Sequence, residues 1–314
     1  MKKIILSMLR FYKSVIIFFK NIRYLFKNSL KNLNKEVDKK LKRIDGFDLD
    51  CMRMVDNIIY EMPDKLNLIN KPKIKNFSET VDELVNSNLS IIRFGDGEII
   101  LMRGGDIGFQ SNDEVLGLRL KEILQSNNSD ILIGINYHYY YADLRDFHEY
   151  PKYVYRTFIS DIRNYLSTII NFDTQYYSAG ITSPYQMFKN YDFEQHYDKL
   201  MSIWRGKDIA IICGNKSFEN IKYNIFDCAS FIEYQYCPFS NAFTNYENIF
   251  NRALGVDKSK VIITILGPTA KLLTFDLVKA GYRVLDLGHL AKDFDDYKKQ
   301  SIKNKETIGK FFEN

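Results

Sequence analysis

Short apolar runs alternate with longer amphipathic segments along most of this chain. The apolar runs are rich in Ile and Val and predict buried strands at 89–94, 131–135, 176–180, 208–213, 230–234, 261–266 and 283–287. Helical patterns lie between them at 76–87, 113–126, 151–170, 192–204, 216–223, 244–254 and 269–280. Strands that are apolar throughout indicate a sheet covered on both faces. The alternation therefore predicts an α/β fold with a mostly parallel sheet and helices on both faces.

The composition agrees with a globular protein. Of the 314 residues, 46% are hydrophobic and 15% aromatic, enough to bury a sizeable core. The four cysteines show no paired spacing of the kind that binds zinc or forms a disulfide framework. A reducing, cytosolic setting fits this pattern best.

The positive charge is concentrated near the N-terminus. Residues 1–35 hold nine Lys or Arg and no acidic residue, so removing them from the net charge of +5 leaves −4 on the remainder. A body with net negative charge gives no support to nucleic acid as a partner. Residues 1–45 are interpreted as a basic arm and linker that precede the globular part.

The arm has the pattern of an amphipathic helix. Its cations fall on one side of a helical wheel, and the opposite side is apolar, with Ile4, Met8, Phe11, Tyr12, Val15, Phe18, Phe19, Ile22 and Phe26. Uncharged runs such as 14–19 are far shorter than the roughly 20 residues needed to span a bilayer. The pattern favours an interfacial helix on an anionic membrane, and thus a cytoplasmic protein held on the inner face of the cell membrane. Packing on the protein's own body or on a partner is the alternative.

Two carboxylates follow the first predicted strand. Arg93 lies within that strand, and Asp96 and Glu98 come just after it with Gly95 and Gly97 beside them. Glycine lets a backbone bend sharply and approach a ligand closely. Two carboxylate oxygens at a strand end suit Mg²⁺ or Mn²⁺, whose other ligands are typically phosphates and water. A solvated acidic turn is the alternative.

Two later strands are each followed by a glycine and then a lysine. The segments are 214–217, which contains Lys216, and 267–271, which contains Gly267, Thr269 and Lys271. If a helix starts there, its free N–H groups and partial positive charge suit a phosphate. Because carboxyl ends of parallel strands share one sheet edge, a metal and a diphosphate would meet there, as in a nucleotide-sugar site. A tight turn with a surface lysine is the alternative for each.

Further candidates lie near the other strand ends. His289 follows the last strand and is a candidate general base, with Asp293, Asp295 or Asp296 as the carboxylate alternative. Asn241 is a candidate contact to a base or sugar, or a helix cap. The tyrosine-rich segment 137–155 could line an acceptor groove or simply pack at the surface.

Four of these segments in this order resemble the GT-D-type glycosyltransferases. The segments are 93–98, 238–243, 266–271 and 286–289, and the resemblance covers residues 75–298, leaving 299–314 as a polar tail. It implies a Rossmann-like fold, a UDP-sugar donor, and a divalent metal held with the diphosphate by Asp96 and Glu98. It also implies an acidic residue near the end of the motif, for which Asp295 stands here.

These observations predict a metal-dependent glycosyltransferase that moves a sugar from a UDP-sugar to a glycan acceptor. The basic arm suggests a lipid-linked acceptor, as in surface-polysaccharide assembly, and glycoprotein synthesis is also compatible. The predicted donor-binding residues are Arg93, Gly95, Gly97, Lys216, Asn241, Gly267, Thr269 and Lys271. A metal-dependent phosphohydrolase and a non-catalytic, membrane-docked sugar-nucleotide-binding protein are the competing hypotheses.

Overall fold

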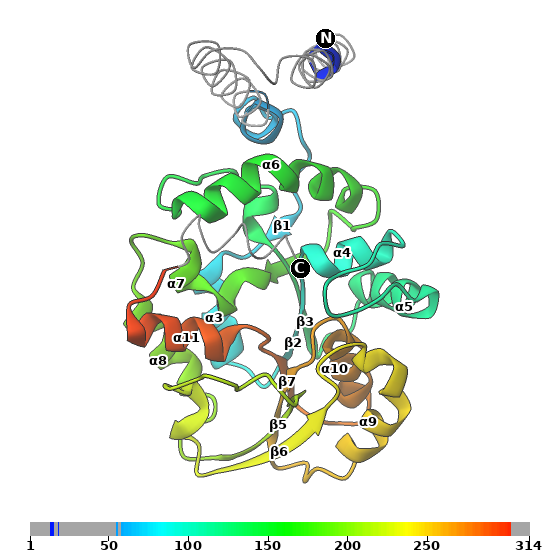
Figure 1. Cartoon of the computed structure of the whole chain (residues 1–314), viewed down its shortest axis with the longest axis vertical. Coiled ribbons are helices and arrows are strands. Elements are labelled where there is room, and N and C mark those ends of the chain that lie inside the picture. Colours follow the sequence, from blue (N-terminus) through cyan, green and yellow to red (C-terminus); the bar gives the residue numbers. More distant parts are fainter. Residues whose placement is uncertain (1–12, 16–17, 19–54, 56–57, 303–314) are drawn as a thin grey trace, which may run out of the picture. The chain divides into compact units, whose positions relative to one another are not determined.

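The computed structural model describes residues 13–15, 18, 55 and 58–302 (Figure 1). The chain divides into two compact units, residues 1–68 and 69–314. Nearly all of the predicted arm and linker, and the tail beyond residue 302, lie outside the described residues. Within the described part, no helix is both long and apolar enough to cross a bilayer.

The second unit is built on one parallel sheet of eight strands. Along the sheet the strands follow the order β1-β4-β3-β2-β8-β7-β5-β6, and every recorded pairing is parallel. The strands are β1 (Lys73–Ile74), β2 (Ser90–Phe94), β3 (Ile131–Ile135), β4 (Gln175–Ser178), β5 (Asp208–Gly214), β6 (Phe231–Cys237), β7 (Val261–Ile265) and β8 (Val284–Asp286). The predicted parallel α/β sheet is thus confirmed, and only the two-residue strand β1 had no counterpart in the sequence pattern.

Helices cover both faces of the sheet. In Figure 1, α3 (Phe77–Val85), α7 (Pro184–Met187), α8 (Phe193–Met201) and α11 (Leu290–Lys299) lie on one side. On the other side lie α4 (Asp96–Met102), α5 (Glu114–Leu124), α9 (Tyr246–Ala253) and α10 (Thr269–Lys279). The remaining long helix is α6 (Glu149–Leu166). Six of the seven predicted helical segments are therefore confirmed.

The helix predicted at 216–223 is wrong, because that segment forms turns. The backbone N–H groups of Lys222 and Tyr223 donate to the Asp295 carboxylate, at 3.0 and 2.9 Å, instead of to carbonyls of a preceding helical turn. A side-chain acceptor from a distant element has replaced the local helical pattern. Helices α4, α7 and α11 had not been predicted, since each is short or strongly polar.

The core explains why the central strands were recognisable. Every residue of β2 and β3 is buried, and 209–212 in β5 are fully buried. Burying one such aliphatic side chain contributes about 1.5–3 kcal/mol, so a run of Ile and Leu fixes a strand in the middle of the sheet. These strands hold the site residues described next on a rigid base.

The order of the strands marks one position at the carboxyl edge. Helix α4 follows β2 on one face of the sheet, whereas α11 follows the neighbouring strand β8 on the other face (Figure 1). The chain thus leaves the carboxyl ends of β2 and β8 towards opposite faces. Ligands of open α/β sheets bind outside the carboxyl ends of the strands at such a divergence.

Candidate functional site

The Asp-x-Glu pair lies in the first turn of α4 rather than in an open turn. Glu98 reaches back so that its Oε2 accepts the backbone N–H of Gly95 at 2.8 Å, which closes the start of the helix. Asp96 occupies the first helical position and its side chain is exposed. Both negative charges therefore lie at the positive end of the helix dipole, which favours this helix start.

A lysine joins Glu98 to the last strand. The Lys271 ammonium lies 3.0 Å from Glu98 Oε1 and 3.2 Å from Asp286 Oδ2, and it donates to the Gly267 carbonyl at 3.2 Å. The side chains of Glu98, Lys271 and Asp286 are 9%, 6% and 1% exposed. These three residues form the carboxylate–lysine cluster, which draws on α4, α10 and β8 at the carboxyl ends of β2 and β8.

Arg93 fixes the position of Asp286 within this cluster. Its Nε donates to the Asp286 carbonyl at 2.6 Å, and its Nη1 donates to Ala179 O and Thr182 Oγ1 at 2.9 and 2.7 Å. The guanidinium is nearly buried, and its hydrogen bonds tie β2, β8 and residues 179–182 together. Arg93 was predicted as a donor contact; the structure gives it a positioning role.

The pKa values of Asp286 and Asp96 are shifted in opposite directions. Burial alone would raise the pKa of Asp286, but Lys271 and Arg93 outweigh it and hold that pKa below the ordinary value. Asp96 behaves in the opposite way. Although its side chain reaches the surface, surrounding protein displaces much of its hydration, and this, with the charge of Glu98, raises its pKa. A cation placed beside Asp96 would relieve that cost.

Asp96 and Glu98 fit part of a divalent-cation site whose other ligands are oxygens of a bound substrate and water. No group of three His, Cys, Asp or Glu side chains within the described residues is arranged to hold a metal. Mg²⁺ and Mn²⁺ sites often use one or two carboxylates and take their other oxygens from phosphates and water. Asp96 offers the open carboxylate, while both oxygens of Glu98 already accept from Gly95 and Lys271.

The start of α10 contributes an unpaired polar group. Gly267 has a φ of +53°, in the left-handed region that favours glycine, and it turns the chain from β7 into α10. Thr269 begins the helix, and its buried Oγ1 has no hydrogen-bond partner among the described residues. A buried hydroxyl without a partner is costly, so it marks a place where a ligand atom would be favourable.

Two other predicted donor contacts take different places. Asn241 has a φ of +51°, donates its N–H to Phe109 O at 2.8 Å, and accepts from Ser111 N at 2.7 Å. It therefore anchors the loop between α4 and α5. Lys216 is exposed in a turn, so its predicted place at a helix start is wrong, although Gly267 and Lys271 do belong to a helix start.

The two candidate bases differ in environment. His289 occupies the N-cap position of α11, shortly after the end of β8, and its side chain is exposed. Asp295 is buried and accepts from two backbone N–H groups and from Lys299 at 2.5 Å. Burial would raise the pKa of Asp295, but these donors hold it below the ordinary value. The geometry thus leaves His289 as the base candidate near β8 and gives Asp295 a structural contact.

The carboxylate alternative Asp293 is also structural. Its oxygens accept from the backbone N–H groups of Tyr185 and Gln186, both at 3.1 Å, and from the Tyr197 hydroxyl at 2.6 Å. Burial raises its pKa to about 6. Asp293 therefore caps the start of α7 and fastens it to α11.

The tyrosine-rich segment approaches the same edge. Tyr137 and Tyr141 stack with ring centroids 4.3 Å apart. The pKa of Tyr150 is raised by burial and by the charge of Asp96, which places that phenol in the electrostatic range of the exposed carboxylate. Tyr150 is thus the residue of this segment whose electrostatic contact with Asp96 is seen.

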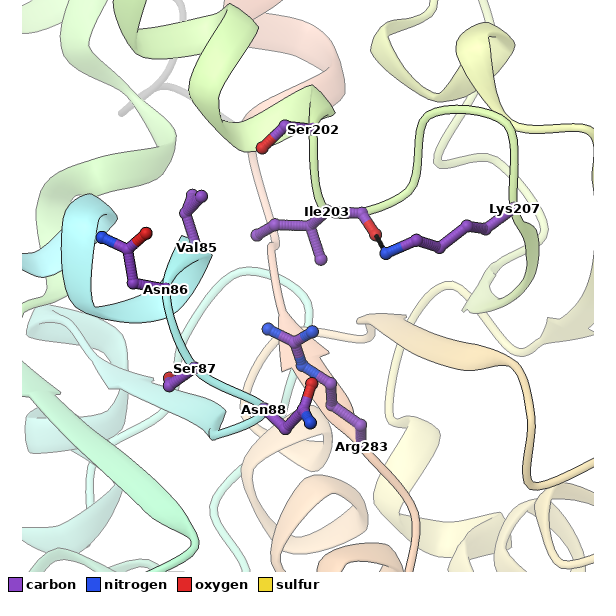
Figure 2. Close-up of a pocket in the computed structure, with 8 residues that line it drawn as sticks. All are labelled: Val85, Asn86, Ser87, Asn88, Ser202, Ile203, Lys207 and Arg283. Carbon is purple, nitrogen blue, oxygen red and sulfur yellow. Dashed lines mark hydrogen bonds between the residues drawn. The ribbon is translucent and has the colours of Figure 1, made fainter.

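A hollow of about 400 Å³ lies at the other edge of the sheet (Figure 2). The residues that line it come shortly before β2, β5 and β8, so the hollow lies at the amino ends of these strands. They are Val85, Asn86, Ser87, Asn88, Ser202, Ile203, Lys207 and Arg283. Arg283 donates to Leu84 O and Lys207 donates to Ile203 O, both at 2.9 Å, near the carboxyl ends of α3 and α8. These cations complete helix ends, so the hollow is not the candidate substrate site.

Comparison with known proteins adds a family to this geometry. The family model described as "Glycosyltransferase GT-D fold" matches residues 91–313. The chain is 27% identical over 248 residues to "Glycosyltransferase GlyD" of Streptococcus pneumoniae serotype 4, covering 78% of this chain and 30% of that protein. It is 30% identical over 233 residues to "Probable glycosyl transferase Gly" of Streptococcus gordonii, covering 71% and 32%. The chain thus spans about a third of the length of these curated relatives.

Solved structures show the same fold. One, described as a new glycosyltransferase (DUF1792) from Streptococcus sanguinis, aligns with a TM-score of 0.70 and 27% identity over 74% of this chain and 87% of that one. Another, described as the highly conserved domain of unknown function 1792 with a distinct glycosyltransferase fold, has a TM-score of 0.70 and 29% identity, covering 75% and 85%.

Proposed function

Because this chain belongs to the family of glycosyltransferases with the GT-D fold, we propose that it transfers a sugar from a UDP-sugar to a glycan acceptor with the help of Mg²⁺ or Mn²⁺. The observation that carries this proposal is the exposed Asp96 beside the buried, ion-paired carboxylate–lysine cluster at the carboxyl ends of the neighbouring strands β2 and β8. One carboxylate is open to an incoming cation, and the others are held fixed.

Different residues of the site bind the donor, hold the carboxylates and accept the proton. The amino end of α10, with the Thr269 hydroxyl, faces the diphosphate, since helix N-termini and unpaired donors favour phosphate oxygens. Lys271 holds the carboxylates of Glu98 and Asp286 in place, and Lys271 and Arg93 together keep the pKa of Asp286 low. A divalent cation held by Asp96, with Glu98 beside it, would neutralise the charge that develops on the departing diphosphate. His289 accepts the proton of the acceptor hydroxyl.

A UDP-release assay tests this function. The protein is incubated with a panel of UDP-sugars and candidate glycans, with and without EDTA, and free UDP and free phosphate are both measured. Release of UDP that needs both an acceptor and a divalent ion supports the proposal. Release of phosphate without an acceptor would identify a phosphohydrolase, and binding of UDP-sugars without any turnover would identify a non-catalytic binding protein.

His289→Ala is expected to lower turnover by roughly a hundredfold while leaving UDP affinity unchanged, because a general base acts on the acceptor and not on the donor. Steady-state kinetics and UDP calorimetry measure the two effects separately. Asp295→Asn is the contrasting variant. It should lower the thermal stability and leave turnover nearly unchanged, because Asp295 anchors residues 222 and 223. Wild-type turnover in His289→Ala would place the base elsewhere.

Residues 1–35 are proposed to hold the protein on anionic lipid, which would suit a lipid-linked acceptor. Deleting them should abolish sedimentation with anionic liposomes without loss of UDP-sugar binding, because all nine cations of this segment are removed. Each Lys or Arg near such a surface contributes about 1 kcal/mol. Binding of the full-length chain should weaken as salt rises, since salt screens this attraction. Equal sedimentation of both proteins would contradict the membrane role.

A further inference from the structure

An aromatic ring lies directly over the glycine that precedes α10. A Cβ added to Gly267 would come within 2.5 Å of Phe109 Cε2, so the ring rests on the bare backbone of this turn. Phe109 is nevertheless 41% exposed. The chain thus presents an apolar ring to solvent next to the point where Thr269 leaves a buried hydroxyl without a partner.

The loop that carries this ring is held in one conformation. Ile107 and Gln110 exchange two backbone hydrogen bonds, of 3.0 and 3.1 Å, which close a tight turn with Phe109 near its tip. Asn241 holds the far side of the turn through Phe109 O and Ser111 N. A side chain on such a braced loop loses little further freedom when a ligand packs against it, which favours binding.

We propose that Phe109 is the platform on which the nucleobase of the sugar-nucleotide donor stacks, with Asn241 as its positioning residue. The inference rests on the proposed function, because it takes the diphosphate to lie at the amino end of α10. In a nucleoside diphosphate the base lies one ribose away from the diphosphate, so a flat apolar surface beside the phosphate turn suits it. Aromatic rings stack well on the face of any base.

The ring's placement also accounts for the glycine beneath it. Any side chain at position 267 would push the ring away, and the φ of +53° disfavours such a residue independently. Asn241, at a φ of +51°, uses its own left-handed conformation to meet the loop with both its N–H and its Oδ1. Two uncommon backbone conformations on different strand-end loops thus converge on the position of one exposed ring.

Calorimetry of two ligands tests the platform. UDP and inorganic pyrophosphate, each with Mn²⁺, are titrated into the full-length wild-type chain and into Phe109→Leu. We expect UDP affinity to fall about tenfold in the variant and pyrophosphate affinity to stay unchanged, because only UDP carries a base. Phe158→Leu is the matched control, since Phe158 is 49% exposed on α6, and it should bind both ligands as the wild type does.

A second variant reports stacking directly. Phe109→Trp keeps an aromatic surface and should keep UDP affinity, and its indole fluorescence should be quenched by UDP but not by pyrophosphate. The chain's single natural tryptophan, Trp204, is fully buried and gives a constant background. Equal UDP affinity in wild type and Phe109→Leu, or a change in the acceptor KM alone, would overturn the platform and leave the proposed function standing. Absence of UDP binding to the wild type would overturn both.

Discussion

Replacing Lys271 by methionine is expected to lower the free energy of unfolding by about 3–5 kcal/mol at neutral pH. Methionine roughly preserves the length and volume of the side chain, so the packing of α10 is maintained. The variant leaves the carboxylates of Glu98 and Asp286, which are 9% and 1% exposed, without the cation between them. Breaking a buried pair in this way is costly because the remaining charges stay desolvated.

The pH dependence of this loss separates it from a packing defect. In the wild type the folded-state pKa of Asp286 is lowered, so its contribution to stability is present above its unfolded pKa of about 3.9 and is lost as pH falls through the lower folded value. In Lys271→Met the pKa of Asp286 should rise, because Arg93 alone then opposes the effect of burial. The deficit should therefore shrink as pH falls from 7 towards 4.

Urea unfolding at several pH values measures both quantities. Lys216→Met is the matched control, because Lys216 is exposed in a turn and should change stability by less than 0.5 kcal/mol, roughly the range for surface substitutions. A loss in Lys271→Met that does not vary with pH would mean that packing, and not charge, accounts for the role of this lysine. No loss at all would refute the cluster as an ion-pair network.

Asp96→Asn is expected to remove metal-dependent UDP binding and to lower turnover roughly a thousandfold, since a bound metal supplies several kcal/mol of charge stabilisation. The side chain is exposed and its carboxylate has a raised pKa, so the fold should tolerate the neutral amide. Calorimetry of UDP in Mn²⁺ and in EDTA, together with turnover, measures the effect.

Glu98→Gln differs in its expected outcome. Glu98 closes the start of α4 and faces Lys271, so this variant should lose stability as well as donor binding. Asp173→Asn, at another exposed aspartate, is the control for a general loss of charge. If Asp96→Asn retains the Mn²⁺-dependent part of UDP affinity, the metal assignment is incorrect.

The sequence by itself determined the sheet and its covering helices. Runs such as 131–135 and 208–213 are apolar throughout, and only a strand buried on both faces needs that pattern, so local composition was sufficient. It also located the segments around 93–98 and 267–271, because glycines at strand ends have few structural alternatives. Strand β1 and helix α4 were less predictable, since β1 is two residues long and α4 begins with acidic residues flanked by glycines.

Only the tertiary structure decided which of these polar residues face a ligand and which face each other. Lys271 meets Glu98 and Asp286 from far along the chain, Asp295 is taken up by the backbone of residues 222 and 223, and Asn241 holds the Phe109 loop. The sequence does not distinguish a carboxylate or amide at a strand end that contacts water from one that contacts a metal or a buried lysine. Those partners are fixed by long-range packing, which brings together residues that no local pattern connects.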